Sequence, residues 1–158
     1  MAISPNDTFT SGQILTAQEC NQFPFGVVAL ASSTTSYALT TTETIATGMT
    51  VTFTALADRY YKITYFEPVA ETPSSSGLTY LTIRKTNATG TVLNNTLIRS
   101  ESATADISGM TCLIITTLTA GSNTIVGTAY SSSTSGTPDL GRDATRTAQL
   151  LVEDIGPA

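Results

Sequence analysis

Residues 49–55, Met-Thr-Val-Thr-Phe-Thr-Ala, alternate strictly between apolar and hydroxyl-bearing side chains, and this stretch constrains the fold more than any other. In an extended chain successive side chains point to opposite faces, so the apolar groups share one face and the threonines share the other. The pattern predicts a strand with one buried face. Residues 59–66 are aromatic and β-branched and predict a second strand. Because only residues 56–58 separate the two, we expect them to pair as the central hairpin of an all-β domain.

Threonine and serine take the place of charged residues in this chain. Of its 158 residues, 12% are charged and 41% are hydrophobic. Threonine is disfavoured inside helices and favoured on pleated surfaces, so the composition indicates strands with hydroxyl-bearing outer faces. The length suits one domain with a substantial core. About eight to ten short strands separated by turn signals predict an antiparallel, jelly-roll-like β-sandwich over residues 26–158.

Two further pairs of segments are predicted as hairpins. Residues 78–85 and 92–99 flank a turn of sequence Asn-Ala-Thr-Gly, in which Gly90 can supply a positive φ. Residues 110–118 and 124–130 flank Ala-Gly-Ser-Asn, which predicts another tight turn.

Residues 110–118 form the most hydrophobic of the predicted strands. The run Cys-Leu-Ile-Ile within it points alternately to both faces, so both faces must be covered. Either the strand lies in the middle of the sandwich or its outer face meets a second subunit. In the second case Leu113 and Ile115 are the candidate interface residues.

Residues 1–25 are expected to form an N-terminal arm and a short helix. Thr16 and Glu19 have the spacing of a capping box, and Pro24 ends the helical segment, which we expect to reach about residue 22. A short amphipathic segment buries little surface alone, so we expect it to anchor the domain on a neighbouring protein. The candidate anchor residues are Phe9, Leu15, Phe23 and Phe25.

Charge and hydropathy argue against several classes of partner. The formal net charge is −5 and the isoelectric point is near 4.4, which argues against binding a nucleic acid backbone. A run of 18 apolar residues is lacking, so we expect no membrane span, and no secretory signal is visible. The two cysteines, Cys20 and Cys112, are interpreted as small core residues and not as a disulfide.

The residues that carry most hydrolytic chemistry are missing or scattered. The chain contains no histidine, which removes Ser-His and Cys-His nucleophiles and the usual zinc ligands. Carboxylates in predicted loops are usually solvated charges, and no calcium-loop motif is present, so we expect neither an enzyme, nor a cofactor, nor a metal site. The carboxylates considered for such sites are Glu67 with Glu71, Glu101 with Asp106, and Asp139 with Asp143.

Three parts of the chain resemble a group of small structural proteins encoded by tailed bacteriophages. They are the lead-in 9–24, with Phe-Thr-Ser-Gly followed by Leu-Thr-Ala, Asn21 and Pro24; residues 50–55 with 59–63; and the ending Leu-Val-Glu-Asp-Ile-Gly. Proteins of this kind include head decoration proteins, head or tail fibres and minor tail proteins. The resemblance implies a homo-oligomer, often a trimer, on a virion, in contact with a major capsid or tail protein. It implies no active site.

Two functions follow as expectations. The first is a non-enzymatic virion protein, made in the bacterial cytoplasm, that decorates the capsid or forms a short fibre as a homotrimer. The alternative is a phage adhesin that recognises host cell-surface glycan through the loops 70–77 and 131–143 and through tyrosines such as Tyr65 and Tyr80. The segment 131–144 contains two glycines and a proline and is predicted to be an exposed loop. A depolymerase is disfavoured by the missing histidine.

Overall fold

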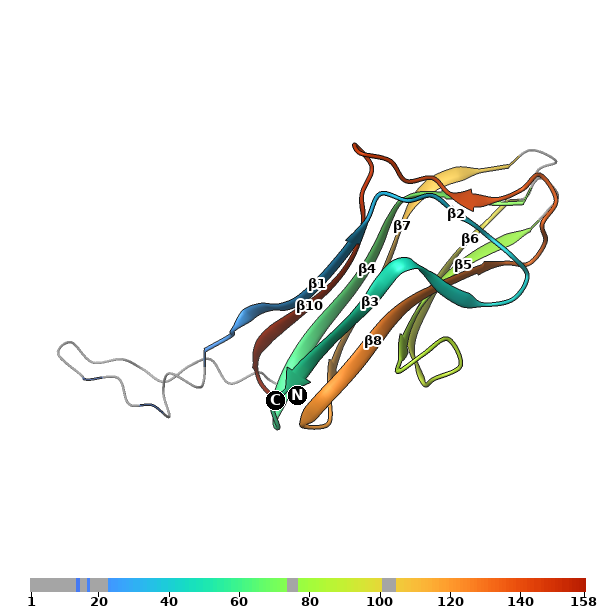
Figure 1. Ribbon diagram of the computed structural model, residues 1–158. Helices are drawn as coiled ribbons and strands as arrows, with labels where there is room; N and C mark the ends of the chain where they lie inside the picture. Colours follow the sequence, from blue (N-terminus) through green and yellow to red (C-terminus); the bar gives the residue numbers. More distant parts are fainter. Residues whose placement is uncertain (1–13, 15–16, 18–22, 74–76, 101–104) are drawn as a thin grey trace.

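The computed structural model describes residues 14, 17, 23–73, 77–100 and 105–158 and shows a sandwich of two antiparallel sheets (Figure 1). One sheet has the strand order β1-β10-β4-β7 and the other β3-β8-β5-β6, while β2 and β9 form a small third sheet. The strands are β1 (Gly26–Ser33), β2 (Tyr37–Ala38), β3 (Thr44–Ala55), β4 (Arg59–Glu71), β5 (Leu78–Lys85), β6 (Val92–Arg99), β7 (Ile107–Thr117), β8 (Gly121–Ser131), β9 (Asp139–Leu140) and β10 (Ala148–Pro157).

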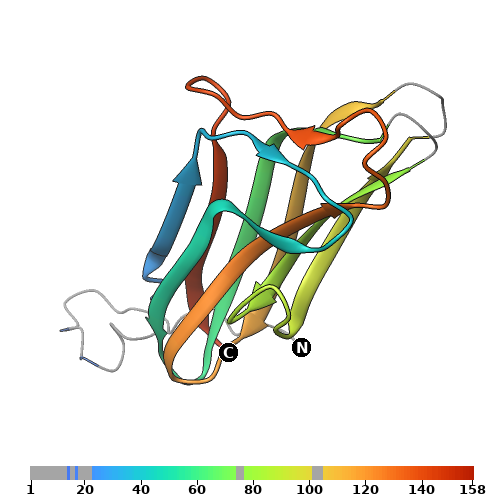
Figure 2. The same cartoon turned by 45° about the vertical axis from the view of Figure 1, so that its right-hand side comes forward.

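The chain is a single antiparallel ribbon folded back on itself at the β5–β6 turn. Outward from that turn, β4 pairs with β7, β3 with β8, β2 with β9 and β1 with β10. The ribbon is rolled so that β10 also pairs with β4 and β8 also pairs with β5, which produces the two stacked sheets seen from a second side in Figure 2. This rolled ribbon is a jelly roll. The predicted all-β, antiparallel, jelly-roll-like sandwich is therefore confirmed.

Two of the three predicted hairpins are wrong. β3 and β4 lie in different sheets, so the link at residues 56–58 crosses the sandwich, and the link between β7 and β8 does the same. Stacked sheets are about 10 Å apart, a gap that three residues span, so a short connector suits a crossing as well as a hairpin. The β5–β6 hairpin is confirmed.

The alternation that predicted the strands does decide which side chains are buried. The apolar residues of β3 from Ala46 onward, and every second residue of β4 up to Glu67, point into the core between the sheets, where β8 and β10 add aliphatic side chains. The largest of these buried side chains are Met49, Tyr61, Ile63, Tyr65, Leu81, Ile83, Ile125, Leu140, Leu150 and Val152. The threonines of β3 face solvent, as the sequence predicts.

The turn between β5 and β6 forms where it was predicted, but for a different reason. Thr86, not Gly90, has the positive φ, at 76°. Gly90 is required by close approach, because a Cβ there would lie 1.7 Å from the carbonyl oxygen of Lys85. Asn87 Oδ1 accepts hydrogen bonds from the amide and the hydroxyl of Thr89 and so holds the turn.

The segment 131–144 is not simply an exposed loop. It contains β9, whose pairing with β2 covers the end of the sandwich at which β4 finishes, and we call this the loop end. Leu140 and Arg142 are buried there, and the amide of Gly141 donates to the carbonyl of Val69. Of the predicted helix, with its cap at Thr16, only Ala17 is among the described residues, and it has helical conformation.

Gly127 makes room for the largest side chain of the core. A Cβ on this residue of β8 would lie 2.9 Å from the Tyr65 ring, whose hydroxyl is fixed by a 2.5 Å hydrogen bond to Glu67. We expect Gly127→Ala to lower the free energy of unfolding by about 1–3 kcal/mol, because the ring must shift in a close-packed interior. Urea denaturation measures this change.

Gly109→Ala is the matched control for this measurement. Its new Cβ would meet nothing nearer than the carbonyl oxygen of Pro68 at 3.4 Å, an ordinary contact. We expect a change within about 0.5 kcal/mol. Equal stability of the two variants would contradict the proposed role of Gly127.

Candidate functional site

The outer face of the β1-β10-β4-β7 sheet carries a row of side chains that crosses all four strands. Leu30 pairs in register with Leu151, Leu151 with Thr64, and Thr64 with Leu113. Leu30 is 54% exposed and Leu113 is 43% exposed. Ile115, 54% exposed, and Phe66, 37% exposed, lie on either side of this row. We call these six residues the apolar face.

One ion pair lies beside the apolar face. Lys62 Nζ lies 2.7 Å from Glu153 Oε2 on the neighbouring strand, and the pair lies in register with Ile115. The two charges cancel, so they add no local excess of either sign.

Within the apolar face, the Oγ1 atom of Thr64 is buried between its neighbours and has no hydrogen-bond partner among the described residues. An unpaired buried hydroxyl is costly. Because this atom is covered by the chain itself, it is not open to a partner on the face.

β7 lies at the edge of its sheet. This position excludes one of the two alternatives predicted from the sequence. A place in the middle of the sandwich is wrong, because β7 pairs only with β4. Met110 and Cys112 point into the core, whereas Leu113 and Ile115 point outward and remain exposed in the single chain. Their predicted role in a subunit interface stays a prediction, and the structure places both residues on the apolar face.

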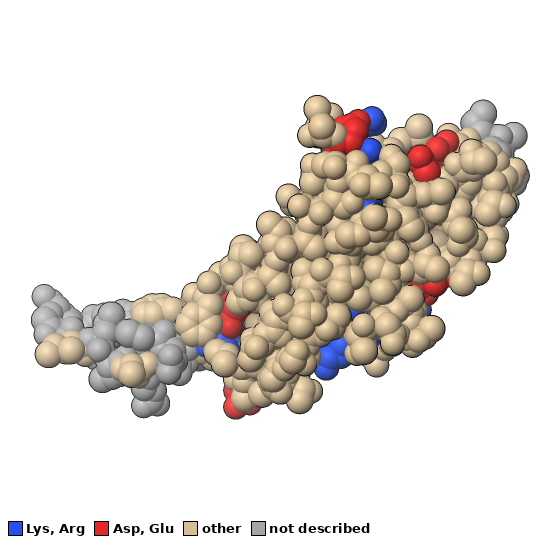
Figure 3. Space-filling view, viewed as in Figure 1, with Lys and Arg blue, Asp and Glu red and all other residues tan. Residues whose placement is uncertain are grey.

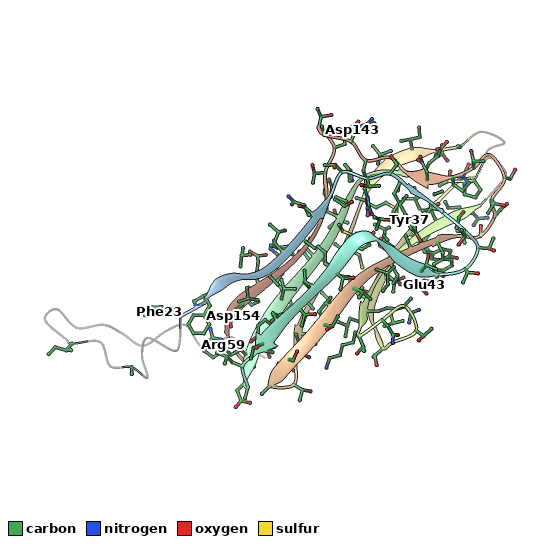
Figure 4. All side chains as sticks on the ribbon, viewed as in Figure 1. Phe23, Tyr37, Glu43, Arg59, Asp143 and Asp154 are labelled. Atoms are coloured by element: carbon green, nitrogen blue, oxygen red, sulfur yellow. The ribbon has the colours of Figure 1, made fainter. Side chains whose placement is uncertain are left out.

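Two of the anchor residues predicted from the sequence, Phe23 and Phe25, precede β1 at the opposite end of the molecule from β9, whereas Phe9 and Leu15 lie outside the described residues. Phe23 lies near Arg59 and Asp154 (Figure 4), and Phe25 lies beside the C-terminal residues. We call this the arch end, because the link between β3 and β4 turns over here. Phe25 is half exposed and lines a shallow hollow together with Leu56, Ala57, Asp58, Arg59, Pro157 and Ala158.

Arg59 ties the segment before β1 to the sandwich. Its Nε and Nη2 atoms donate to the two carboxylate oxygens of Asp154 at 2.5 and 2.6 Å, and Nη2 also donates to the carbonyl of Phe23 at 2.6 Å. The ring of Phe25 lies over the guanidinium, 4.3 Å from ring centroid to Cζ. No local sequence pattern points to the pairing of Arg59 with Asp154, because the two residues lie 95 positions apart in the sequence.

Glu67 and Arg142 form an ion pair inside the sandwich. Both side chains are 0% exposed, and Arg142 Nη2 lies 2.5 Å from Glu67 Oε1. Arg142 also donates to the carbonyl of Thr47 at 2.7 Å. Burial alone lowers the pKa of Arg142, but the Glu67 carboxylate raises it, and the net pKa lies above its ordinary value. Burial, with Glu67 beside it, raises the pKa of Tyr65 well above its usual range.

The prediction that Glu67 is a solvated carboxylate is therefore wrong. Glu67 lies on an inward-facing position of β4, so it is sealed from any substrate, and its oxygens are occupied by Arg142 and Tyr65. Glu101, the other main candidate, lies outside the described residues. At the surface, hydrogen bonds from Arg146 hold the pKa of Asp143 well below its usual range. Within the described ranges, no three His, Cys, Asp or Glu side chains gather as metal ligands would.

Charged side chains are few and scattered on the side of the molecule shown in Figure 3. Among the described residues, five cations have a carboxylate partner: Arg59, Lys62, Arg84, Arg142 and Arg146. Cys112 is a buried free thiol, as predicted, and burial raises its pKa to about 11. The described part of the chain holds no helix of the length and hydropathy that a membrane crossing requires.

Two of the six tyrosines lie in the core and two lie on the outer face of the second sheet. Tyr61 and Tyr65 are core residues, so a role for Tyr65 in stacking on glycan is wrong. Tyr80 of β5 and Tyr130 of β8 are half-buried neighbours on the outer face of the β3-β8-β5-β6 sheet. Their rings are stacked, with centroids 4.4 Å apart and planes inclined by 5°.

Comparisons with known proteins give little beyond the architecture. No family model matches the chain, and no curated protein sequence does. The chain is similar to a crystal structure of dimeric latent PorU from Porphyromonas gingivalis, with a TM-score of 0.42, 8% identity and coverage of 84% of this chain. The match spans only 13% of the PorU chain. So distant a likeness does not bear on function.

Removing one partner of the internal ion pair is expected to destabilise the protein strongly. Arg142→Met leaves the Glu67 carboxylate buried without its cation, which costs about 3–5 kcal/mol of unfolding free energy. The double variant Arg142→Met, Glu67→Gln removes both charges and should recover a large part of that loss. Urea denaturation at neutral pH measures both.

Arg146→Met is the matched control, because its ion pair with Asp143 lies on the surface. We expect this variant to unfold like the unmodified protein. An Arg142→Met protein as stable as the control would show that the internal pair does not support the fold.

Proposed function

We propose that this chain is a non-enzymatic structural protein of a tailed-phage virion, which decorates the capsid exterior or forms a short head or tail fibre as a homotrimer. The observation that carries the proposal is the apolar face, on which Leu30, Phe66, Leu113 and Ile115 are exposed together. Soluble monomers rarely leave contiguous apolar patches open, and such patches mark protein–protein contacts. The occupant proposed for this face is a second copy of the same chain.

Two features support a copy of the same chain as the occupant. Lys62 and Glu153 offer both charge signs side by side, so identical faces do not repel one another. The resemblance of the segments 9–24, 50–63 and 151–156 to phage structural proteins favours a homo-oligomer.

A role on a particle gives the two ends of the molecule different tasks. At the arch end, Arg59 fixes the backbone at Phe23 and holds Phe25 at the surface. Phe23 is therefore held at a defined point of the sandwich, as an anchor that begins there requires. Jelly rolls occur in viral capsid proteins and in lectins, and the fold alone assigns neither role.

The decisive test is the mass of the protein in solution. We expect light scattering over a range of concentrations to give the mass of three chains, and Leu113→Glu to give one chain, because a buried unpaired carboxylate opposes association. The matched control is Val92→Glu, since Val92 is equally exposed, at 45%, but lies on β6 of the other sheet. A monomeric unmodified protein would refute the assembly role of the face.

A second measurement tests the location. Purified phage particles are expected to contain the chain in fixed ratio to the major capsid or tail protein, measured by quantitative mass spectrometry. If the chain is abundant in the infected cell and missing from particles, it is not a virion protein.

A further inference from the structure

We propose that the hollow at the arch end receives the segment around Phe9 from a neighbouring copy of the chain. The inference rests on the homo-oligomer of the proposed function, and it names a second copy as the protein that the predicted anchor segment holds. We call residues 1–22 the arm. The hollow is a different surface from the apolar face, because none of the six residues of that face lines it.

The hollow has apolar walls and a volume of about 670 Å³. Phe25 is 50% exposed and Leu56 is 46% exposed, and Ala57 and Pro157 add further apolar surface. Hollows of several hundred cubic ångström with a mainly apolar lining are typical of binding sites. Exposed apolar walls favour an apolar occupant, and the volume leaves room for an aromatic side chain with its neighbours.

Apolar surface runs from the apolar face to the hollow along β1. The bulge between Val27 and Ala29 shifts the register, so Val27 and Leu30 are both exposed although they are an odd number of positions apart. Val28 and Ala29, between them, pack against the core. Phe25, in the wall of the hollow, lies just before β1. A neighbour that covers the apolar face at Leu30 therefore comes close to the hollow.

The chain is fixed to the rim of the hollow directly after the arm. Arg59 Nη2 donates to the carbonyl of Phe23 at 2.6 Å, and the ring of Phe25 lies over the same guanidinium. Within the arm, the side chain of Ile14 is 88% exposed, so its own sandwich does not cover it. At Ile14 the arm is therefore open to a partner.

The composition of the arm fits the hollow. Residues 1–13 contain the apolar side chains of Ile3 and Phe9 and one charged side chain, Asp7. Phe9 stands between two threonines, so it is an isolated aromatic group in a polar segment. Aromatic side chains bury a large apolar area and gain further from contact with a second ring. The half-exposed ring of Phe25 offers that contact.

Length and symmetry allow the arm to reach a neighbour. In a cyclic oligomer, equivalent parts of all copies lie at the same height along the symmetry axis, so each hollow lies level with the hollows of the other copies. Phe9 lies 14 positions before Phe23, and an extended chain of that length spans up to about 46 Å. The 13 residues of β4 extend over about 43 Å. The arm can therefore span a distance equal to the longest strand of the sandwich.

Photo-cross-linking of the full chain tests the proposal. The photoreactive residue p-benzoylphenylalanine replaces Phe9, and equal amounts of ordinary and heavy-isotope-labelled chains are refolded together from urea. A glutamate-specific protease then separates the arm peptide 1–19 from the peptides 20–43, 44–71 and 154–158, which carry the walls of the hollow. We expect links between the arm peptide and these wall peptides. About half of the links should join an ordinary to a labelled peptide, because neighbours are drawn at random.

Leu56→Glu is the variant expected to remove the links. It places a carboxylate in the apolar wall, and covering an unpaired carboxylate is costly, so the yield of mixed-isotope links should fall about tenfold or more. The matched control is Leu97→Glu, since Leu97 is similarly exposed, at 49%, but lies on β6 of the other sheet. This control should leave the yield unchanged. Both leucines are exposed, so neither variant should impair folding.

Three outcomes overturn the proposal: no links to the wall peptides, links within one isotope only, or equal yields in the Leu56→Glu and Leu97→Glu proteins. Links within one isotope only would show that each arm fills its own hollow. Light scattering on the same samples separates this inference from the assembly role. A trimer without mixed-isotope links overturns the exchange of arms alone, whereas a monomer overturns both.

Discussion

The structure depends on pairing between strands that are far apart in the sequence. Only the β5–β6 pair is local, and at the open end of the ribbon Gly26 lies beside Asp154. Closing such long loops costs conformational entropy before any core is buried, so non-local sheets fold slowly. The side chains of the interior must then pack well in one arrangement. The close fit of the Tyr65 ring against Gly127, where a Cβ would have no room, is part of that arrangement.

Two buried arginine–carboxylate pairs hold β4, one near each end of the strand. Arg59 meets Asp154 of β10 at the arch end, and Glu67 meets Arg142 at the loop end. A slip of one residue between β4 and β10 would move Asp154 to the outer face and leave Arg59 buried without its carboxylate. Because an uncompensated buried charge is far more costly than an exchanged apolar contact, we infer that these pairs serve the register of the roll more than its total stability.

The sequence predicts what is local and misses what is distant. Alternation in residues 49–55 correctly identifies the buried side of β3, since a period of two needs no knowledge of the partner strand. The same pattern does not distinguish a hairpin from a link that crosses between the two sheets. It therefore predicts that β3 pairs with β4, whereas in the structure β3 pairs with β8. Arg142 lies in a segment rich in glycine and serine that resembles a surface loop, and its burial follows only from Glu67 on another strand. Leu113 and Ile115 were identified because their strand is apolar on both faces.

The way the sheet edges are covered favours a face over an edge as the site of the proposed association. An open edge strand invites further strands and unlimited growth. Here the edges of the two sheets lie opposite each other, β1 beside β3 and β6 beside β7. A bulge between Val27 and Ala29 interrupts the register of β1, and Asn94 of β6 donates to the carbonyl of Leu113 at 2.6 Å. With the edges occupied in this way, the surface left for a neighbour is a face of limited extent. Contacts of that kind can close around a symmetry axis, which gives an oligomer of fixed size and not an open-ended filament.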